Sequence, residues 1–215
     1  MLDLPGTGTE YTRDSPASVA EISDDLRKRF ERNGSTGSTG STIIVAVSLG
    51  GMVALDWCAR YPSDFHKAVV INTSAGDLSR AWERLDWRNY PSVMRAAASS
   101  NPRVRERCVV ELTINKQDFD REALIARWTD YACERPVGRA TLFRQLFAAA
   151  RSKLPDTAGV PTLVLGSKGD RLVRPACSER IAEKLKAPLA MHDSGGHDLP
   201  FDDAPWVLER IKEFV

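Results

Sequence analysis

The sequence predicts an α/β fold in which a mostly parallel sheet is flanked by helices and carries one helical insertion. Short runs of apolar and β-branched residues, typical of buried strands, occupy residues 43–47, 67–72, 161–166 and 189–192. Helical patterns separate these runs, an alternation typical of parallel βα units. A polar loop containing Ser, Gly or Asp follows each run, as expected at the carboxyl edge of a parallel sheet.

The composition places the chain among single-domain proteins. Its 215 residues suffice for one α/β domain with a modest insertion. The 30 Lys and Arg residues nearly balance 29 Asp and Glu residues, which argues against a general attraction to nucleic acid or anionic membranes. The first residues lack the basic and apolar regions of a secretion signal, and no apolar run approaches the length of a membrane span. We therefore expect a soluble, cytoplasmic protein.

The cysteines give no sign of a metal site or a disulfide framework. They are far apart, form no C-x-x-C pair and fall within helical patterns (Cys58, Cys108, Cys133 and Cys177). Such a pattern fits a reducing compartment.

The amino-terminal part is predicted to contain a loop, a helix and a linker. Residues 2–4 resemble the end of a strand, and residues 5–8 form a Pro- and Gly-rich loop. Residues 15–18 offer caps for a helix that should run to about Asn33 and end at Gly34, with Val19, Ile22, Leu26 and Phe30 on one buried face. Three Gly-Ser-Thr triplets at 34–42 indicate a flexible linker or surface loop, and the segment lacks the Gly-Lys ending of a phosphate-binding loop.

The segment 43–57 combines a strand, a sharp turn and a helix. Because residues 43–47 are apolar throughout, we expect a strand that is buried on both faces. Ser48 follows this strand, and one interpretation is that its hydroxyl only caps the next helix. The small residues Ala46, Gly50 and Gly51 favour a second interpretation, a nucleophile on a tight, strained turn.

The segment 77–155 is predicted to be an inserted helical layer interrupted at Pro91, Pro102 and Pro136. It carries 13 Arg and 2 Lys against 10 acidic residues, a net charge of +5, whereas the rest of the chain carries −4. A basic cover over a pocket would favour anionic or carrier-bound substrates, although exposed arginines on amphipathic helices are the ordinary explanation. Its aromatic residues would either line an apolar pocket or form the core of the layer (Trp82, Trp87 and Trp128).

The last part supplies the remaining polar candidates. The strand at 161–166 leads to Gly169-Asp170, and the strand at 189–192 leads to a Gly-rich loop that contains His197. A helix over 175–186 lies between these strands, and a final helix begins near Pro205 with Asp202 or Asp203 as its cap.

Ser48, Asp170 and His197 thus follow three different strands, in the chain order Ser, Asp, His. A Ser hydroxyl becomes an effective nucleophile when an imidazole accepts its proton, and a carboxylate can hold that imidazole in the required tautomer. His66 is predicted to be a surface residue and His192 a structural one. Asp193 and Asp198 are too close to His197 in sequence to face it easily, which favours Asp170, although an Asp after Gly169 could also be an ordinary turn residue.

The sequence resembles the α/β-hydrolase superfamily, close to cofactor-free esterases with a helical lid. The resemblance rests on Asp3-Leu4-Pro5-Gly6-Thr7-Gly8, Ser48-Leu49-Gly50-Gly51, Gly169-Asp170 and Gly196-His197 followed by Leu199-Pro200. It implies that Ser48 is the nucleophile, His197 the general base and later acid, and Asp170 the residue that orients the imidazole. It further implies an oxyanion contact from the N–H of Leu49 and no metal or organic cofactor. The lid would be residues 77–155, between core parts 1–76 and 156–215.

The chain also departs from the family pattern. Ala46 replaces the first Gly of the turn, and the sequence begins where the fourth strand of the family ends. A strand beside 43–47, and the loop that supplies the second oxyanion N–H, would therefore be missing, so that the second donor is not identified. We expect a truncated enzyme sequence; a natural short form that pairs through the exposed sheet edge, and a degenerate binding protein, are the alternatives.

The predicted function is a serine hydrolase that cleaves a carboxylic ester or thioester through an acyl-enzyme. An acyltransferase or a perhydrolase would use the same three residues with a different acceptor. A binding module that has kept the motifs without activity is the alternative from another class.

Overall fold

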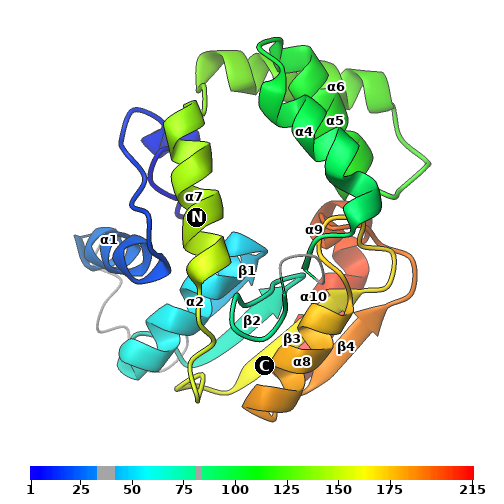
Figure 1. Ribbon diagram of the computed structural model, residues 1–215. Helices are drawn as coiled ribbons and strands as arrows, with labels where there is room; N and C mark the ends of the chain where they lie inside the picture. The colour runs from blue at the N-terminus through cyan, green and yellow to red at the C-terminus, as the bar shows by residue number, and fades with distance from the viewer. Residues whose placement is uncertain (33–41, 81–83) are drawn as a thin grey trace.

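The computed structural model describes residues 1–32, 42–80 and 84–215. Its sheet contains β1 (Ile43–Val47), β2 (Lys67–Ile71), β3 (Thr162–Ser167) and β4 (Leu189–His192), in the spatial order β1-β2-β3-β4 (Figure 1). All three strand pairs are parallel. The predicted α/β class and the strands predicted at 43–47, 67–72, 161–166 and 189–192 are confirmed, whereas residues 2–4 are not part of a strand.

The strand register aligns the loops that were singled out in the sequence. Val47 lies opposite Ile71, Ile71 lies opposite Leu165, and Ser167 lies opposite His192. Because the strands are parallel, the residues that follow them all leave the same edge of the sheet. Ser48, Asn72 and the loops that carry Asp170 and His197 are thereby brought to one edge.

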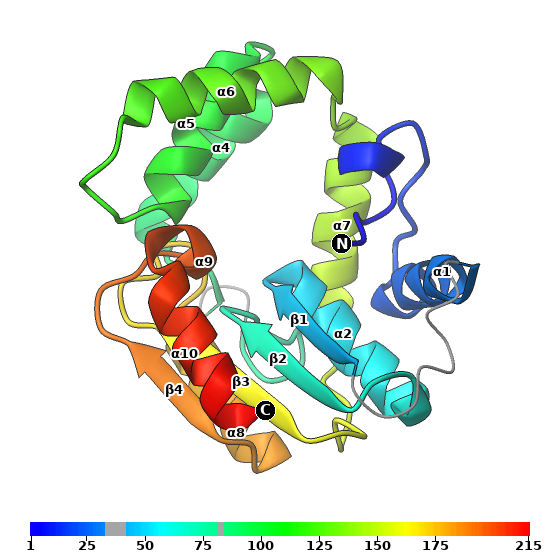
Figure 2. The same ribbon diagram turned by 180° about the vertical axis from the view of Figure 1, so that it is seen from behind.

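Helices cover both faces of the sheet. α2 (Leu49–Arg60) and α8 (Ala176–Leu185) pack on one face, against Val70 and Val164. α10 (Ala204–Phe214) packs on the other face, against Val69 and Leu165, as the two views show (Figures 1 and 2). The strands are therefore apolar on both sides, which explains why their sequences do not alternate.

α1 (Val19–Arg32) packs against α2. Ser18 caps its first turn: the Ser18 hydroxyl accepts from Glu21 N (3.2 Å) and donates to the Glu21 carboxylate (2.9 Å). The predicted face is correct, since Val19, Ile22 and Leu26 are buried and Phe30 packs against them.

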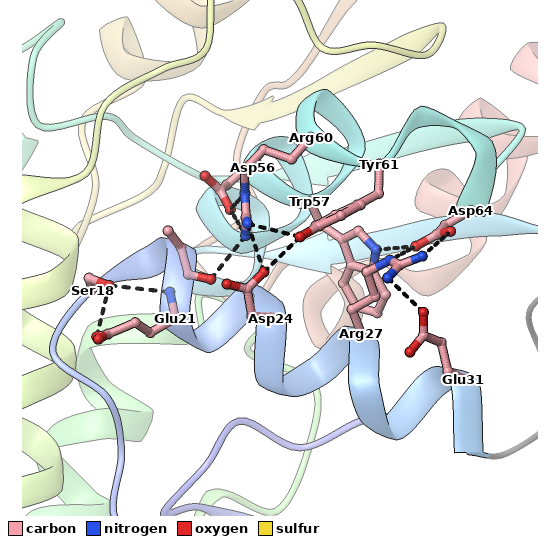
Figure 3. A network of polar contacts seen from close by, with 11 residues as sticks. Ser18, Glu21, Asp24, Arg27, Glu31, Asp56, Trp57, Arg60, Tyr61 and Asp64 are labelled. Atoms are coloured by element: carbon pink, nitrogen blue, oxygen red, sulfur yellow. Dashed lines mark hydrogen bonds and ion pairs between the residues drawn. The ribbon is translucent and has the colours of Figure 1, made fainter.

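Polar contacts fasten α1 to α2 beside this apolar face (Figure 3). Asp64, in the short 3₁₀ turn η2 (Pro62–Asp64), accepts from Trp57 Nε1 at 2.8 Å and from Arg27 Nε at 2.7 Å. Arg60 Nη1 contacts Asp24 at 2.7 Å. Trp57 is almost fully buried, so its indole N–H needs this partner. These contacts fix the helix that begins directly after Ser48.

The amino-terminal motif forms a closed loop. The Asp3 carboxylate accepts from both the backbone N and the hydroxyl of Thr9, each at 2.8 Å. The backbone hydrogen bond from Thr9 is the main cause of a lowered Asp3 pKa. The loop leads into the 3₁₀ turn η1 (Gly8–Glu10) and lies beside α7 (Arg139–Arg151), whose Gln145 side chain donates to Pro5 O at 3.2 Å.

The prediction that β1 is buried on both faces is wrong. Val45 is 49% exposed, and the other residues of the strand are only half-buried. In the described part of the chain β1 pairs with β2 alone, so it forms an edge of the sheet. An apolar edge strand has the same local sequence as a central one, which is why the run Ile-Ile-Val-Ala-Val could not distinguish them.

Between β2 and β3 the described residues form helices and no strand. These are the 3₁₀ turn η3 (Trp87–Asn89), α4 (Tyr90–Ala98), α5 (Pro102–Thr113), α6 (Arg121–Glu134) and α7 (Arg139–Arg151). Pro91 and Pro102 lie in the first turns of α4 and α5, where a missing N–H costs nothing, so they begin helices rather than interrupt them. α4, α5 and α6 lie together beyond the carboxyl edge of the sheet, and α7 leads back toward α2 (Figures 1 and 2).

Some predictions fall outside the described residues. These are the end of the first helix at Gly34, the triplet linker apart from Thr42, and the position of Trp82. Within the ranges that are described, no helix combines the length and the apolar character needed to cross a membrane.

Candidate functional site

Ser48 lies in a strained turn between β1 and α2. Its backbone angles are φ 54° and ψ −122°, in the left-handed half of conformational space that non-Gly residues rarely occupy. Ser48 N donates to Ile71 O at 2.9 Å, and Ser48 O accepts from Thr73 Oγ1 at 2.7 Å. The hydroxyl makes no capping hydrogen bond to α2. The interpretation of Ser48 as a mere helix cap is therefore wrong.

The small residues around Ser48 permit a close approach of the backbone. A Cβ on Gly51 would lie 2.7 Å from Thr73 Cβ, a distance that real side chains do not adopt. A Cβ on Gly50 would lie at an ordinary 3.7 Å from Ala46 Cβ. Gly51 is thus required by its contact with the loop after β2, and Ala46 fits the turn without a clash.

Leu49 is the first residue of α2. The first N–H groups of an α-helix have no partner inside the helix and carry the positive end of its dipole. The backbone N–H of Leu49 therefore suits a developing negative charge beside Ser48.

Asp170 and His197 form a direct, buried contact. His197 Nδ1 lies 2.8 Å from Asp170 Oδ2, and the residues are only 6% and 8% exposed. The other oxygen, Asp170 Oδ1, accepts from Leu172 N and Val173 N at 2.8 and 2.9 Å. One carboxylate oxygen thus holds the loop while the other holds the imidazole, in the tautomer with hydrogen on Nδ1.

In the described part of the chain, neither rival carboxylate is hydrogen-bonded to the His197 ring. Asp193 is exposed and pairs with Lys168 at 2.6 Å, and this hydrogen bond lowers the Asp193 pKa. Burial raises the pKa of Asp198, whose backbone N donates to Thr113 O at 2.9 Å.

The rival histidines occupy the predicted kinds of position. His66 is exposed. His192 Nδ1 accepts from Gly195 N at 2.7 Å, and its Nε2 lies 3.3 Å from Asp203. His192 therefore shapes the loop that leads to His197.

Asn72, which follows β2, was missed in the sequence. It adopts a left-handed conformation with φ 47° and is almost fully buried. Its side-chain Nδ2 donates to Gly196 O at 3.0 Å and to His197 O at 2.9 Å, and so ties the His197 loop to the strand that neighbours β1. A polar residue directly after a buried strand was the available signal.

In the described part of the chain no hydrogen bond joins the Ser48 hydroxyl to His197, although both residues lie at the same sheet edge.

Asn115 and Asp202 were also missed. The Asn115 side chain donates to the backbone of both the Asp170 loop and the His197 loop. The Asp202 carboxylate accepts from the backbone N–H groups of Asn115 and Gly196. The sequence pattern allowed Asp202 as the cap of the last helix, but Asp203 fills that position and accepts from Trp206 N at 3.0 Å.

The model of the "Alpha/beta hydrolase family" matches residues 1–210, nearly the whole chain. The chain belongs to this family. The predicted membership is confirmed, while no curated protein matches the sequence.

Solved α/β-hydrolase structures share the fold at low sequence identity. An enol-lactonase from Burkholderia xenovorans superimposes with a TM-score of 0.76 at 17% identity, over 99% of this chain and 78% of that one. A lipase-esterase related protein from Clostridium acetobutylicum gives 0.73 at 18%, over 100% and 82%. A thermophilic esterase from Thermogutta terrifontis gives 0.69 at 18%, over 98% and 76%. At these identities the likeness shows the fold alone.

The tryptophans of this α/β-hydrolase differ in their surroundings. Trp87 is 63% exposed in η3. Trp128 packs against a small core formed by Val110, Ile114 and Ile125 of the α5–α6 region, as the alternative interpretation of these aromatic residues expected. Within the described ranges no group of three His, Cys, Asp or Glu side chains is placed to hold a metal ion.

Proposed function

We propose that this α/β-hydrolase is a serine hydrolase that cleaves a carboxylic ester or thioester through an acyl-enzyme on Ser48. The observation that carries the proposal is the buried 2.8 Å contact between His197 and Asp170, at the same sheet edge as the strained Ser48 turn. The names of the enol-lactonase and esterase neighbours support ester chemistry as the reaction class.

Each residue has a defined part in the proposed mechanism. His197 Nε2 accepts the Ser48 proton while Ser48 Oγ attacks the carbonyl carbon, and Asp170 stabilises the imidazolium that forms. The N–H of Leu49 donates to the developing oxyanion. The imidazolium then protonates the leaving alcohol or thiol as its bond to the acyl carbon breaks. Water, deprotonated by the same imidazole, then attacks the acyl carbon. The bond from that carbon to Ser48 Oγ breaks, the imidazolium returns its proton to Oγ, and the acid is released.

The helices of residues 77–155 would act as a lid between core parts 1–76 and 156–215. Large apolar side chains are exposed on α4 and α7, among them Met94, Phe143 and Phe147, and Trp87 is exposed nearby in sequence. Such residues can line a site for an acyl chain. Trp82 would belong to the same lid. The net charge of +5 favours an anionic or carrier-bound substrate.

The same three residues could transfer the acyl group to an acceptor other than water. Acyl transfer or perhydrolysis would follow if the site admitted another nucleophile to the acyl-enzyme. A binding module without activity is the alternative outside catalysis.

A labelling experiment tests the proposal. A fluorophosphonate probe should react with the folded protein, and peptide mapping should find the adduct on Ser48, because the probe requires an activated Ser. The same preparation should release product from short-chain p-nitrophenyl esters and thioesters. A folded, monodisperse sample that neither reacts with the probe nor hydrolyses any ester would instead support the binding module.

We further propose that the exposed edge of β1 mediates association of two copies of the chain. A groove beside β1 is lined by apolar residues of the amino-terminal segment and the strand, including Leu2, Leu4, Ile43 and Val45. An uncharged, apolar edge is a template for pairing with a second strand.

We propose the cytoplasm as the location of the protein. All four cysteines are free, which suits a reducing compartment.

The edge is tested with Val45→Lys. Wild-type protein should form dimers in analytical ultracentrifugation at micromolar concentration, and V45K should shift the population to monomer, because an edge lysine opposes strand pairing. Leu208→Lys is the control, since Leu208 is similarly exposed (54%) on α10. A wild-type monomer at every concentration, or an equal effect of L208K, would contradict the proposal.

A further inference from the structure

The segment that follows α5 joins the two loops that carry Asp170 and His197. α5 ends at Thr113, and residues 114–116 lead away from it toward α6. These residues come from the helical layer between β2 and β3, far in sequence from both loops. Several hydrogen bonds nevertheless connect these residues to both loops.

Asn115 is at the centre of these contacts. Its side-chain Nδ2 donates to Gly169 O and to Ser194 O, each at 2.9 Å. Gly169 directly precedes Asp170, and Ser194 lies three residues before His197. A single amide group therefore ties the backbone of the carboxylate loop to that of the imidazole loop.

The backbone around Asn115 reinforces this connection. The Asp202 carboxylate accepts from Asn115 N and Lys116 N, each at 3.0 Å, and also from Gly196 N. Thr113 O accepts from Asp198 N at 2.9 Å. A Cβ on Gly196 would lie 2.4 Å from Thr113 O, so the His197 loop needs Gly at this point of contact.

The carboxylate loop is held from the same side. Arg171, which follows Asp170, donates through Nη2 to Ile114 O at 2.9 Å, and Ile114 is fully buried. Residues 113–116 thus contact the residues that precede and follow Asp170 and those that precede and follow His197. These hydrogen bonds do not involve the side chains of Asp170 and His197 themselves.

We propose that Asn115 is a positioning residue, which sets the separation of the two loops and so maintains the contact between His197 Nδ1 and Asp170. The inference rests on the proposed function for its kinetic consequence. Displacement of a catalytic group by about 1 Å can cost up to about 100-fold in rate, so one lost bridge between the loops has a measurable effect.

The main test is Asn115→Ala, in which two loop carbonyls lose their donor. The value of kcat for ester hydrolysis and the rate of fluorophosphonate labelling should fall by about 10- to 100-fold. KM should change by less than about threefold, because a positioning residue acts on the catalytic groups and not on the bound substrate. Asn115→Asp, similar in size but an acceptor facing two carbonyl oxygens, should be at least as impaired as N115A.

Asn101→Ala is the matched control. Asn101 caps the other end of α5, where its side chain accepts from Arg103 N at 3.0 Å. N101A should lower the Tm through the lost cap while kcat stays within about twofold of wild type. If N101A reduces kcat as much as N115A does, or if N115D is as active as wild type, Asn115 has only a structural role and the proposal is wrong.

A spectroscopic measurement separates this proposal from the proposed function. The proton on His197 Nδ1, hydrogen-bonded to a carboxylate, should give a strongly deshielded ¹H NMR signal that is absent in His197→Ala. N115A should weaken or shift this signal, and N101A should not. If the wild type is inactive but its signal still depends on Asn115, the proposed ester hydrolysis is wrong and the positioning role stands. An unchanged signal in N115A would overturn the positioning role.

Discussion

Ser48→Ala should reduce kcat for ester hydrolysis by about 10⁴- to 10⁶-fold and leave the stability of the fold almost unchanged. The loss in rate follows from removal of the nucleophile, after which only the remaining electrostatic groups can assist water. Steady-state assays with an active-site titration of the wild type would measure it.

The stability of the same variant is equally informative. A capping serine contributes about 1 kcal/mol, and its loss would lower the Tm of a chain of this size by about 2–4 °C. Because the Ser48 hydroxyl makes no capping bond, we expect the Tm of S48A to stay within about 1 °C of wild type. A clear drop in Tm with turnover retained would mean that the Ser48 hydroxyl has a structural role and that another group is the nucleophile.

Asp170→Asn should lower kcat by about 10⁴-fold with little change in KM. Asn Oδ1 can still accept from Leu172 N and Val173 N, so the loop keeps its shape. The amide nitrogen would then face His197 Nδ1 as a donor, where the carboxylate was an acceptor. This favours the tautomer with hydrogen on Nε2, which cannot accept the Ser48 proton.

Asp193→Asn is the matched control for this variant. Asp193 also lies near His197 in sequence, but it is exposed and paired with Lys168. Its substitution should change kcat by less than about twofold, because an exposed ion pair contributes little. Equal losses in D170N and D193N would argue against a specific role for the buried carboxylate.

The parts of the molecule that depend on local sequence could be predicted. The strands were found because runs such as residues 67–72 are too short and too apolar for another structure, and parallel strands end at one edge. The pairing of Asp170 with His197 was expected from the resemblance to the α/β-hydrolases. The exposure of Val45 could not be predicted, since it depends on whether a neighbouring strand is present and not on β1 itself.

The supporting residues of the site were missed for a related reason. Asn72, Asn115 and Asp202 act through hydrogen bonds to backbone atoms. Apart from the bond of Asp202 to Gly196 N, the partners lie far away in the chain, as in the bonds of Asn115 to Ser194 and of Asn72 to His197, which span 79 and 125 positions. Asp202 also resembled an ordinary helix cap, because two adjacent acidic residues precede the final helix. Every residue type offers the same backbone carbonyl and nearly every type the same N–H group, so these partners cannot be recognised in the sequence of their own segment.

The contacts of residues 113–116 limit which segments of this protein can be exchanged for those of another family member. A chimera that exchanged the whole segment 77–155 for that of a relative would import a new junction with the Asp170 and His197 loops, and not only a new cover. Grafts that stop short of Thr113, or that resume after Lys116, would keep the native junction. The boundary of the exchangeable module therefore lies inside the helical layer, at the end of α5.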